Sequence, residues 1–299
     1  PGASILSLVR YVITALNLTR KLGHCTLLCT NKALARLDSM TNEILLEYQD
    51  NISTVTLNRP AHRNAIRFHM WGELSHLFLS LDRDANTKAI VLRGAGTESF
   101  CAGADIQDFE QYRNDSNQGY AYNAEVDTLL ETLINLKTPT ISMIQGVAAG
   151  GGCEIATATD IRIATPTARM GIPVARLGIT IGHREMNSLV NLVGKGNALY
   201  ILLSGRLVDG DTALSMGLVT QVVPELDLEN TTYQLAAEIS QLAPLSHAIN
   251  KEILNNVIES PSLTGLSQLQ KELPLKQFDT KDYKEGYNAF LEKRKPDFI

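Results

Sequence analysis

The segment Ile144-Gln-Gly-Val-Ala-Ala-Gly-Gly-Gly-Cys-Glu154 decides the fold more than any other part of the chain. It begins in an apolar strand predicted over 139–145, passes through three consecutive glycines, and enters a predicted helix that carries one carboxylate. Glycine lets a ligand come close to bare backbone, and the first N–H groups of a helix face whatever arrives. The segment therefore predicts a ligand-binding turn between a strand and a helix.

A second turn of the same kind lies about forty residues earlier in the chain. Ser99-Phe-Cys-Ala-Gly-Ala-Asp-Ile106 follows a strand predicted over 88–93 and places a glycine just before another predicted helix. Two such turns can aim two backbone N–H donors at one point. Enzymes use paired backbone donors to hold the oxyanion of a polarised carbonyl group, so the two turns together predict a catalytic site.

Hydrophobic periodicity predicts a layered α/β core followed by a helical region. Apolar residues at helical spacing indicate amphipathic helices over 68–81 and 120–136. Short apolar runs indicate strands at 44–48, 55–57, 88–93, 139–145 and 160–164. After Pro224 the strand pattern ends, and helices are expected over 230–242, 244–257, 262–275 and 282–293. A boundary near 224–227 follows.

Four motifs resemble the enoyl-CoA hydratase/isomerase (crotonase) superfamily in their order and spacing. They are Asn58-Arg-Pro-x-x-x-Asn-Ala65, Phe100-x-Ala-Gly-x-Asp-Ile106, Gln145-Gly-x-Ala-x-Gly-Gly-Gly152 with Glu154, and Phe290-Leu-Glu-Lys-Arg-Lys295. The resemblance covers about residues 42 to 299. It implies an α/β fold, a crotonase-type spiral of repeated β-β-α units with a C-terminal helical oligomerisation region. The expected divisions are an extension over 1–40, a crotonase core over 41–226 and the helical region over 227–299.

The same resemblance implies an enzyme that processes acyl-CoA thioesters through an enolate. It places the two oxyanion N–H donors at Ala104 and Gly151, and it assigns proton transfer to Glu154. A carboxylate near a helix N-terminus is favoured in its ionised form by the helix dipole, which suits a general base. An ordinary helix-start charge is the alternative interpretation of Glu154, and the surrounding glycines favour catalysis.

The chain departs from the family pattern where hydratases carry a second glutamate. In the matching segment Met170-Gly-Ile-Pro-Val-Ala175 that position is Val174, which can neither hydrogen-bond nor exchange a proton. Standard two-glutamate hydration is therefore in doubt, and double-bond isomerisation or decarboxylation of a malonyl- or methylmalonyl-type CoA thioester are alternatives. His183, Arg184 and Glu185 are possible accessory groups: Arg184 or His183 for a departing carboxylate, and Glu185 as a substitute acid.

The resemblance also implies how coenzyme A is bound. It places five residues along the nucleotide and pantetheine arm of coenzyme A, namely Ala61, Arg63, Ala102, Asp105 and Ile106. It places Phe290 and Lys293 near the adenine and the 3'-phosphate. No cofactor beyond the CoA thioester is expected, since the glycine motifs match neither a phosphate-binding loop nor a dinucleotide fingerprint. A homotrimer or a dimer of trimers is expected, and a non-catalytic acyl-CoA-binding or assembly subunit is the alternative from another class. The loops 109–123 and 174–187 are expected to set the acyl group.

Composition favours a soluble globular protein with a small-molecule substrate. With 299 residues, 44% of them hydrophobic, the chain can bury one large core or a core and a smaller lobe. A formal net charge of −5 argues against nucleic acid as the main partner, because phosphate binding needs clustered Lys and Arg. No apolar run approaches the roughly 20 residues of a membrane span. The four cysteines, Cys25, Cys29, Cys101 and Cys153, lack a metal-ligand spacing, and a reducing compartment and no metal site are expected.

Residues 1–40 differ in composition from the rest of the chain. No Asp or Glu occurs before Asp38, whereas five cations are spread among apolar and hydroxylated residues. This composition is typical of an organellar transit peptide, while an unstructured or non-native extension before Met40 is the alternative. The expected location is the cytoplasm, or the mitochondrial matrix if the segment is a transit peptide.

Overall fold

A computed structural model describes residues 42–298 of the chain. Residues 1–40 lie outside this range, and with them both interpretations of that segment, a transit peptide or an unstructured or non-native extension. Cys25 and Cys29 also lie outside it. From Glu43 onward the described residues form one compact unit.

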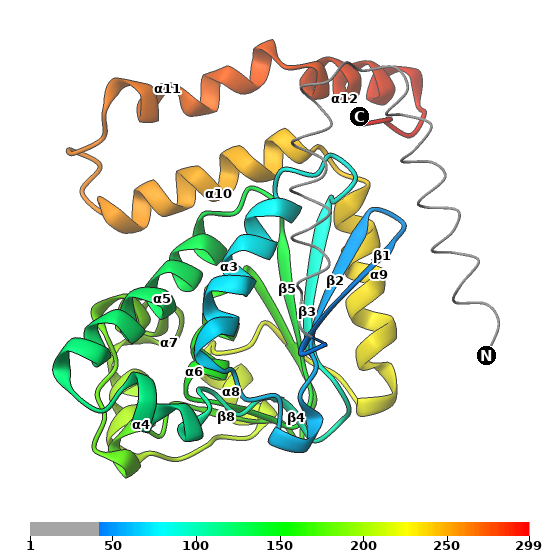
Figure 1. Cartoon of the computed structure of the whole chain (residues 1–299). Coiled ribbons are helices and arrows are strands. Elements are labelled where there is room, and N and C mark those ends of the chain that lie inside the picture. Colours follow the sequence, from blue (N-terminus) through cyan, green and yellow to red (C-terminus); the bar gives the residue numbers. More distant parts are fainter. Residues whose placement is uncertain (1–41, 299) are drawn as a thin grey trace, which may run out of the picture. The chain divides into compact units, whose positions relative to one another are not determined.

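A six-stranded sheet forms the centre of this unit (Figure 1). Its strands, in spatial order, are β1 (Ile44–Gln49), β2 (Ile52–Leu57), β3 (Ala89–Gly94), β5 (Thr140–Ile144), β7 (Ile161–Ala164) and β9 (Gln221–Val222). The first pair is an antiparallel hairpin, and every later pair is parallel. Both faces of a parallel sheet are covered, and β3 and β5 are accordingly buried along nearly their whole length, although β5 contains Thr140 and Ser142.

A three-stranded parallel sheet accompanies the large one. It contains β4 (Ser99–Cys101), β6 (Val147–Ala149) and β8 (Arg169–Gly171), in that order. Each of these short strands follows a strand of the large sheet and precedes helical structure, so the β-β-α unit recurs along the chain. The helices after the small strands are α4 (Phe109–Tyr112) with α5 (Ser116–Asn135), α6 (Gly151–Ala158) and α7 (His183–Ser204). The predicted fold class, a spiral of β-β-α units with a helical C-terminal region, is confirmed.

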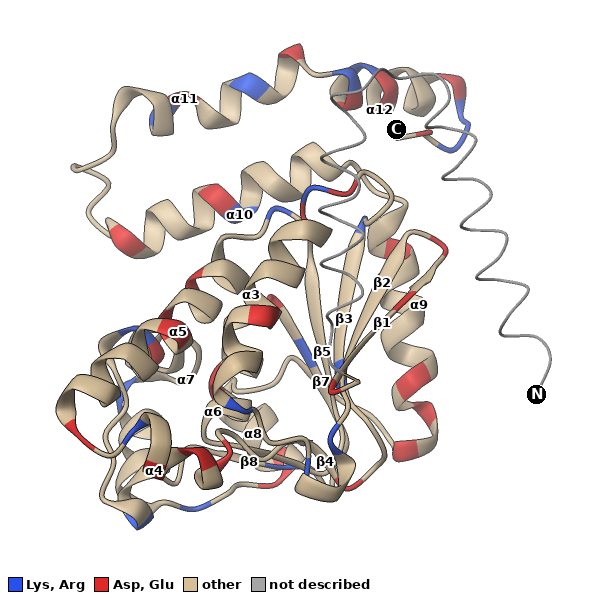
Figure 2. Cartoon of the chain, in the orientation of Figure 1, with Lys and Arg blue, Asp and Glu red and all other residues tan. Residues whose placement is uncertain are grey.

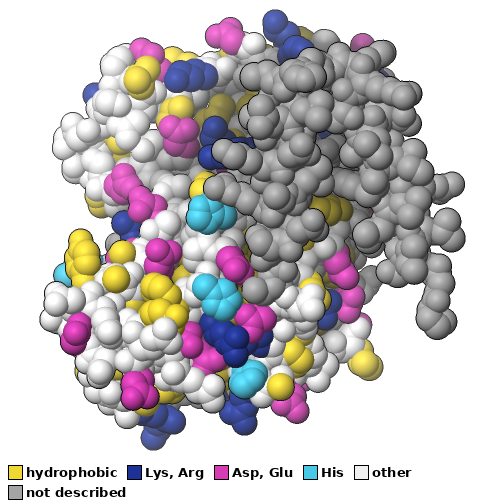
Figure 3. All heavy atoms as spheres, viewed as in Figure 1, with side chains coloured by type: hydrophobic (Ala, Val, Ile, Leu, Met, Phe, Trp, Pro, Cys, Tyr) yellow, Lys and Arg dark blue, Asp and Glu magenta, His cyan; other side chains and the backbone are white. Residues whose placement is uncertain are grey.

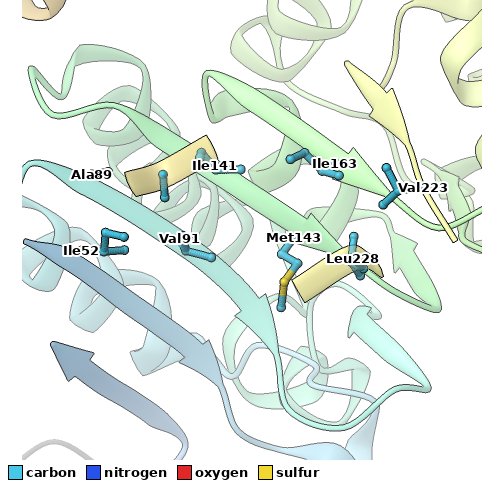
Figure 4. Close-up of a cluster of buried hydrophobic side chains, with 9 residues drawn as sticks. Ile52, Ala89, Val91, Ile141, Met143, Ile163, Val223 and Leu228 are labelled. Atoms are coloured by element: carbon cyan, nitrogen blue, oxygen red, sulfur yellow. The ribbon is translucent and has the colours of Figure 1, made fainter. Parts of the chain in front are cut away.

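The hydrophobic core on one face of the large sheet is completed by α9 (Leu228–Ser240). Apolar side chains at alternate positions of four strands point to this face, as period-2 alternation requires. They are Ile52, Ala89, Val91, Ile141, Met143 and Ile163, and they meet Val223, Leu228 and Ala236 (Figure 4). The intervening side chains of β3, Ile90 and Leu92, are fully buried on the opposite face, where α3 (Phe68–Leu81) lies in Figure 1.

Three helices follow α9 and lie beyond the sheet (Figure 1). They are α10 (Pro244–Glu259), α11 (Gln268–Lys276) and α12 (Lys281–Glu292). One further short helix, α8 (Gly210–Met216), precedes β9 in the core. Lys251 joins α10 to the core through a 2.7 Å ion pair from its Nζ to Asp160 Oδ2. Since α9 packs on the sheet itself, only α10–α12 are separate from it, and the boundary at 226/227 stays a prediction.

The helix expected over 262–275 begins six residues later than predicted. Ser267 is its N-cap, with its Oγ accepting from Gln270 N while the Gln270 side chain accepts from Ser267 N, which is a capping box. Leu263 before it has a left-handed φ of 61°, which a helix does not allow. The apolar spacing of the segment conceals this turn.

The charges of the described residues are of both signs throughout. Figure 2 shows cationic and anionic side chains interspersed along the helices, and Figure 3 shows the two signs intermingled on the face in view. Within residues 42–298, no helix has both the length and the apolar content that a bilayer crossing needs.

Candidate active site

The two glycine turns meet at the carboxyl ends of adjacent strands. Strands β4 and β6 are parallel neighbours, with Ser99 paired to Val147, so the turns that follow them leave the small sheet side by side. A Cβ atom at Gly103 would lie 2.7 Å from the carbonyl oxygen of Ala149 and 3.1 Å from the nitrogen of Gly151. Gly103 also has a φ of +99°, which side chains rarely adopt. The close approach of the turns therefore depends on glycine at this position.

The backbone N–H groups of Ala104 and Gly151 are the donors that this approach brings together. Ile66 N donates to Gly103 O at 2.8 Å, and Asp105 N donates to Ile66 O at 2.8 Å. Because both bonds lie on one side of Ala104, its own N–H points to the other side. Gly151 is the first residue of α6, where an N–H has no partner within the helix. A Cβ built on Gly151 would lie 3.5 Å from Ala104 N, so the two donors are neighbours.

A cavity of about 200 Å³ opens in front of these two donors, and both residues line it. Its wall is largely apolar and aromatic, with contributions from Trp71, Phe109, Tyr122, Val126, Val174 and Ile181. Ile106 and Leu177 also line it and are exposed by 58% and 56%, which places them at its mouth. Three charged side chains reach the cavity: Arg113, Glu154 and Glu185. This is an apolar pocket with a few convergent polar groups, the usual form of a small-molecule site.

Glu154 lies one turn into α6, buried on the cavity wall. Burial, and after it the negative charge of Glu185, raise the pKa of its carboxyl from 4.5 to about 8, although the charge of Arg113 acts to lower it. The helix-start argument predicted an ionised carboxylate, and that prediction is wrong because desolvation and a like charge outweigh the helix dipole. A pKa of about 8 leaves the Glu154 carboxyl mainly protonated at neutral pH.

Glu185 is the second carboxylate of the cavity. It lies in the first turn of α7, and its carboxylate folds back toward the helix start, so that a Cβ at Gly182 would lie 2.6 Å from Oε2. The side chain is buried, and among residues 42–298 its Oε2 has no hydrogen-bond partner. A buried carboxylate oxygen without a partner is costly, and Glu185 also lines the cavity.

The other two accessory residues do not reach the cavity. Arg184 points toward α5, where its Nη2 lies 3.3 Å from Glu131 Oε2 and its Nε lies 3.8 Å from Asp127 Oδ1. His183 is not among the lining residues. Val174 does line the cavity together with Glu154, in the short helix η3 (Val174–Leu177). Of the three accessory residues expected from the sequence, only Glu185 lines the cavity.

The residues expected to hold coenzyme A are divided between the cavity and other places. Ala102 and Ile106 line the cavity. Asp105 is buried beside Arg59, with 2.8 Å between its Oδ2 and Arg59 Nη2, and it also caps η2 (Ile106–Asp108) by accepting from Gln107 N. Four further residues lie outside the lining set, namely Ala61, Arg63, Phe290 and Lys293. Their contact with coenzyme A stays a prediction.

Sequence reasoning missed Arg113 and the aromatic side chains around it. Tyr122, on α5, is fully buried and accepts a 2.9 Å hydrogen bond from Trp71 Nε1. Arg113 follows the four-residue helix α4, and no periodic signal marks that segment. Only the expectation that the loop 109–123 shapes the acyl site pointed to it.

Metal-ligating groups and thiols are the remaining titratable candidates within residues 42–298. No group of three His, Cys, Asp or Glu side chains is placed to hold a metal ion there. Cys101 and Cys153 are free and buried, and burial raises the pKa of each thiol to about 12. Both side chains are therefore neutral packing groups beneath the glycine turns.

The raised pKa of Glu154 predicts a pH-dependent effect on stability. Between pH 4.5 and about 8 the unfolded chain releases this proton while the folded chain keeps it, so the free energy of unfolding falls as pH rises. Glu154→Gln removes this loss. The Tm of the variant minus the Tm of the native protein should therefore be several degrees larger at pH 8 than at pH 5. Thermal melts at both values measure this, and an equal Tm difference at both would contradict it.

Comparison with known proteins identifies the family. The family model described as enoyl-CoA hydratase/isomerase matches residues 47–299. The short-chain-enoyl-CoA hydratase of Clostridium acetobutylicum is 35% identical over 254 residues, covering 85% of this chain and 96% of that protein. The mitochondrial methylglutaconyl-CoA hydratase of Mus musculus is 30% identical, covering 87% of this chain and 83% of that protein.

A solved structure agrees in fold over the same region. The crystal structure of an enoyl-CoA hydratase/carnithine racemase from Magnetospirillum magneticum aligns with a TM-score of 0.83 at 34% identity. The alignment covers 87% of this chain and 96% of that one. The matching family model, the relatives and the shared fold together show that the chain belongs to the enoyl-CoA hydratase/isomerase family.

Proposed function

We propose that the protein hydrates 2-enoyl-CoA thioesters, using Glu154 and Glu185 as its pair of catalytic carboxylates. The single observation that carries this proposal is the position of Glu185, buried on the cavity wall and close enough for its charge to raise the pKa of Glu154. A carboxyl with a raised pKa can act as the acid, and a second carboxyl group beside it can act as the base. Glu185 thus takes over the work of the glutamate that Val174 replaces.

The proposed reaction uses one water molecule and leaves the protein unchanged. The water oxygen bonds to the β-carbon while Glu185 takes one of the water's protons. The electrons of the double bond move to the thioester oxygen, and the N–H groups of Ala104 and Gly151 stabilise the resulting enolate. Glu154 then donates its proton to the α-carbon, and the proton on Glu185 returns to Glu154 to restore the pair.

The alternative reactions have less support from the cavity. Decarboxylation was expected to use Arg184 or His183 for the departing carboxylate, and neither lines the cavity. Isomerisation needs one carboxylate only, which leaves the buried and unpartnered Glu185 without a role. A non-catalytic acyl-CoA-binding subunit has no need for a carboxyl whose pKa is raised to about 8. Hydration accounts for both carboxylates.

The experiment that tests this proposal compares three substrates with purified protein. Crotonyl-CoA reports hydration, a 3-enoyl-CoA reports isomerisation, and methylmalonyl-CoA reports decarboxylation. We expect turnover of crotonyl-CoA with formation of the 3-hydroxyacyl thioester. Turnover of only the 3-enoyl or the methylmalonyl thioester would replace hydration with the corresponding alternative. Tight binding of a saturated acyl-CoA without turnover of any of the three would favour the binding subunit.

We further propose that the active unit is a trimer or a dimer of trimers, assembled through the C-terminal helices. Large apolar side chains of α10–α12 are exposed, among them Phe290 by 82% and Leu269 by 67%. An exposed apolar surface of this kind is typical of a subunit interface. Phe290 and Lys293 then approach coenzyme A on a neighbouring subunit. Light scattering at micromolar concentration should give three or six times the chain mass, and a monomer would contradict the assembly.

A further inference from the structure

Arg113 is a cation of the cavity wall that the proposed hydration does not use. It caps the C-terminus of α4, and its guanidinium carbon lies 5.2 Å from the ring centroid of Phe109 and 5.1 Å from that of Tyr122. Its Nη2 donates to Asn123 Oδ1 at 3.1 Å. Two aromatic rings and one amide therefore hold the group at a defined place beside the acyl site.

The positive charge of Arg113 has no acidic partner among residues 42–298. The ion pairs there engage other arginines, such as Arg184 with Asp127 and Glu131, and Arg59 with Glu43 and Asp105. Guanidinium carries five N–H donors, and Asn123 accepts from only one of its nitrogens. The remaining donors are free to bind a planar anion in two parallel hydrogen bonds.

Arg113 is also not simply the counterion of Glu154. No ion pair joins the two side chains, and the lowering influence of Arg113 on the pKa of Glu154 is the smallest of the three causes. The carboxyl keeps its proton to about pH 8 in spite of the nearby cation. A neutral Glu154 leaves the charge of Arg113 uncompensated, in a cavity whose wall is mainly apolar and aromatic. A substrate with a negative group at this place would compensate it.

We propose that Arg113 binds a carboxylate at the far end of the acyl chain, so that the substrates are 2-enoyl-CoA thioesters of dicarboxylic acids. The inference rests on the proposed hydration and names its substrate class. The N–H groups of Ala104 and Gly151 hold the thioester end of the acyl group, and Arg113 holds the other end, with the reacting double bond between them beside Glu154. Short acyl chains suit the cavity volume of about 200 Å³.

Two thioesters of the same shape test this specificity. Glutaconyl-CoA ends in a carboxylate, and 5-methyl-2-hexenoyl-CoA has an uncharged isopropyl group in its place. The native protein should have the higher kcat/KM for glutaconyl-CoA. In Arg113→Met the ratio of the two kcat/KM values should fall about 100-fold, as loss of one partner of a close charge pair typically causes. Arg184→Met is the matched control, because Arg184 lies outside the cavity and forms ion pairs with Asp127 and Glu131 of α5. The ratio of the two kcat/KM values in Arg184→Met should equal that of the native protein.

A native preference for the isopropyl thioester, or an unchanged ratio in Arg113→Met, would overturn the proposal. Equilibrium binding of the saturated analogues glutaryl-CoA and 5-methylhexanoyl-CoA reads the same site without turnover. If the native protein hydrates no thioester but still prefers glutaryl-CoA, and Arg113→Met removes that preference, the proposed hydration fails while the carboxylate site stands. Equal affinity for both analogues in the native protein would refute the site itself.

Discussion

Glu154→Gln should lower kcat for crotonyl-CoA hydration by about 100- to 10,000-fold, the range typical of a lost general acid or base. Glutamine fills nearly the same volume and hydrogen-bonds, yet it cannot release a proton to the α-carbon. Affinity for a saturated acyl-CoA should change only a few-fold, because the oxyanion donors and the apolar wall are intact. Steady-state kinetics together with calorimetric binding measure the two quantities separately.

Glu110→Gln is the matched control for this substitution. Glu110 is an exposed carboxylate on α4, and it does not line the cavity. Its replacement should leave kcat within about two-fold, since surface substitutions rarely matter. If Glu154→Gln retained native kcat, Glu154 would have no part in proton transfer.

Gly151→Pro should lower kcat by about 100- to 1,000-fold, the usual cost of one lost oxyanion donor. Proline is tolerated at the first position of a helix, which Gly151 occupies in α6, so the substitution deletes the N–H without breaking the helix. The new Cβ has a second effect, because it would lie 2.8 Å from Cη2 of Trp71. The Trp71 ring must then shift.

Gly151→Ala separates the two effects, since it adds the same Cβ and keeps the N–H. The alanine variant should therefore retain much more activity than the proline variant. The ratio of their two kcat values measures the contribution of the Gly151 N–H donor. Thermal melts of both variants show whether α6 remains folded. Equal loss in both variants would attribute the effect to crowding of Trp71 and would remove the Gly151 N–H from the proposed oxyanion hole.

The sequence predicted best those elements whose pattern is long and regular. The helix over 68–81 has its predicted bounds, because its apolar positions follow the helical period for fourteen residues. The three-residue strands β4, β6 and β8 are too short to show an alternation, and β4 and β6 were seen only as glycine turns. The glycine pattern after two predicted strands supplied the two turns, and the fold brings them together as expected.

The chemistry of the site was harder to predict than its location. The direction of the pKa shift at Glu154 depends on burial and on Glu185, which lies thirty-one residues away in the chain, and neither is visible in local sequence. Glu185 was a candidate by position only, since a side chain at a helix start can face solvent as readily as a cavity. Arg113 gave no signal because its role arises from two rings that the fold places around it.

The measurement that tests the central claim most directly is the rate of crotonyl-CoA hydration by Glu185→Gln. This account makes Glu185 the base that activates water in place of the glutamate missing at Val174. It predicts a loss of about 100-fold in kcat with the folded state intact, and a lower pKa for Glu154 once the neighbouring charge is gone. Rapid hydration by the native protein that is unchanged in Glu185→Gln would show that one carboxylate suffices, and would contradict the proposed pair.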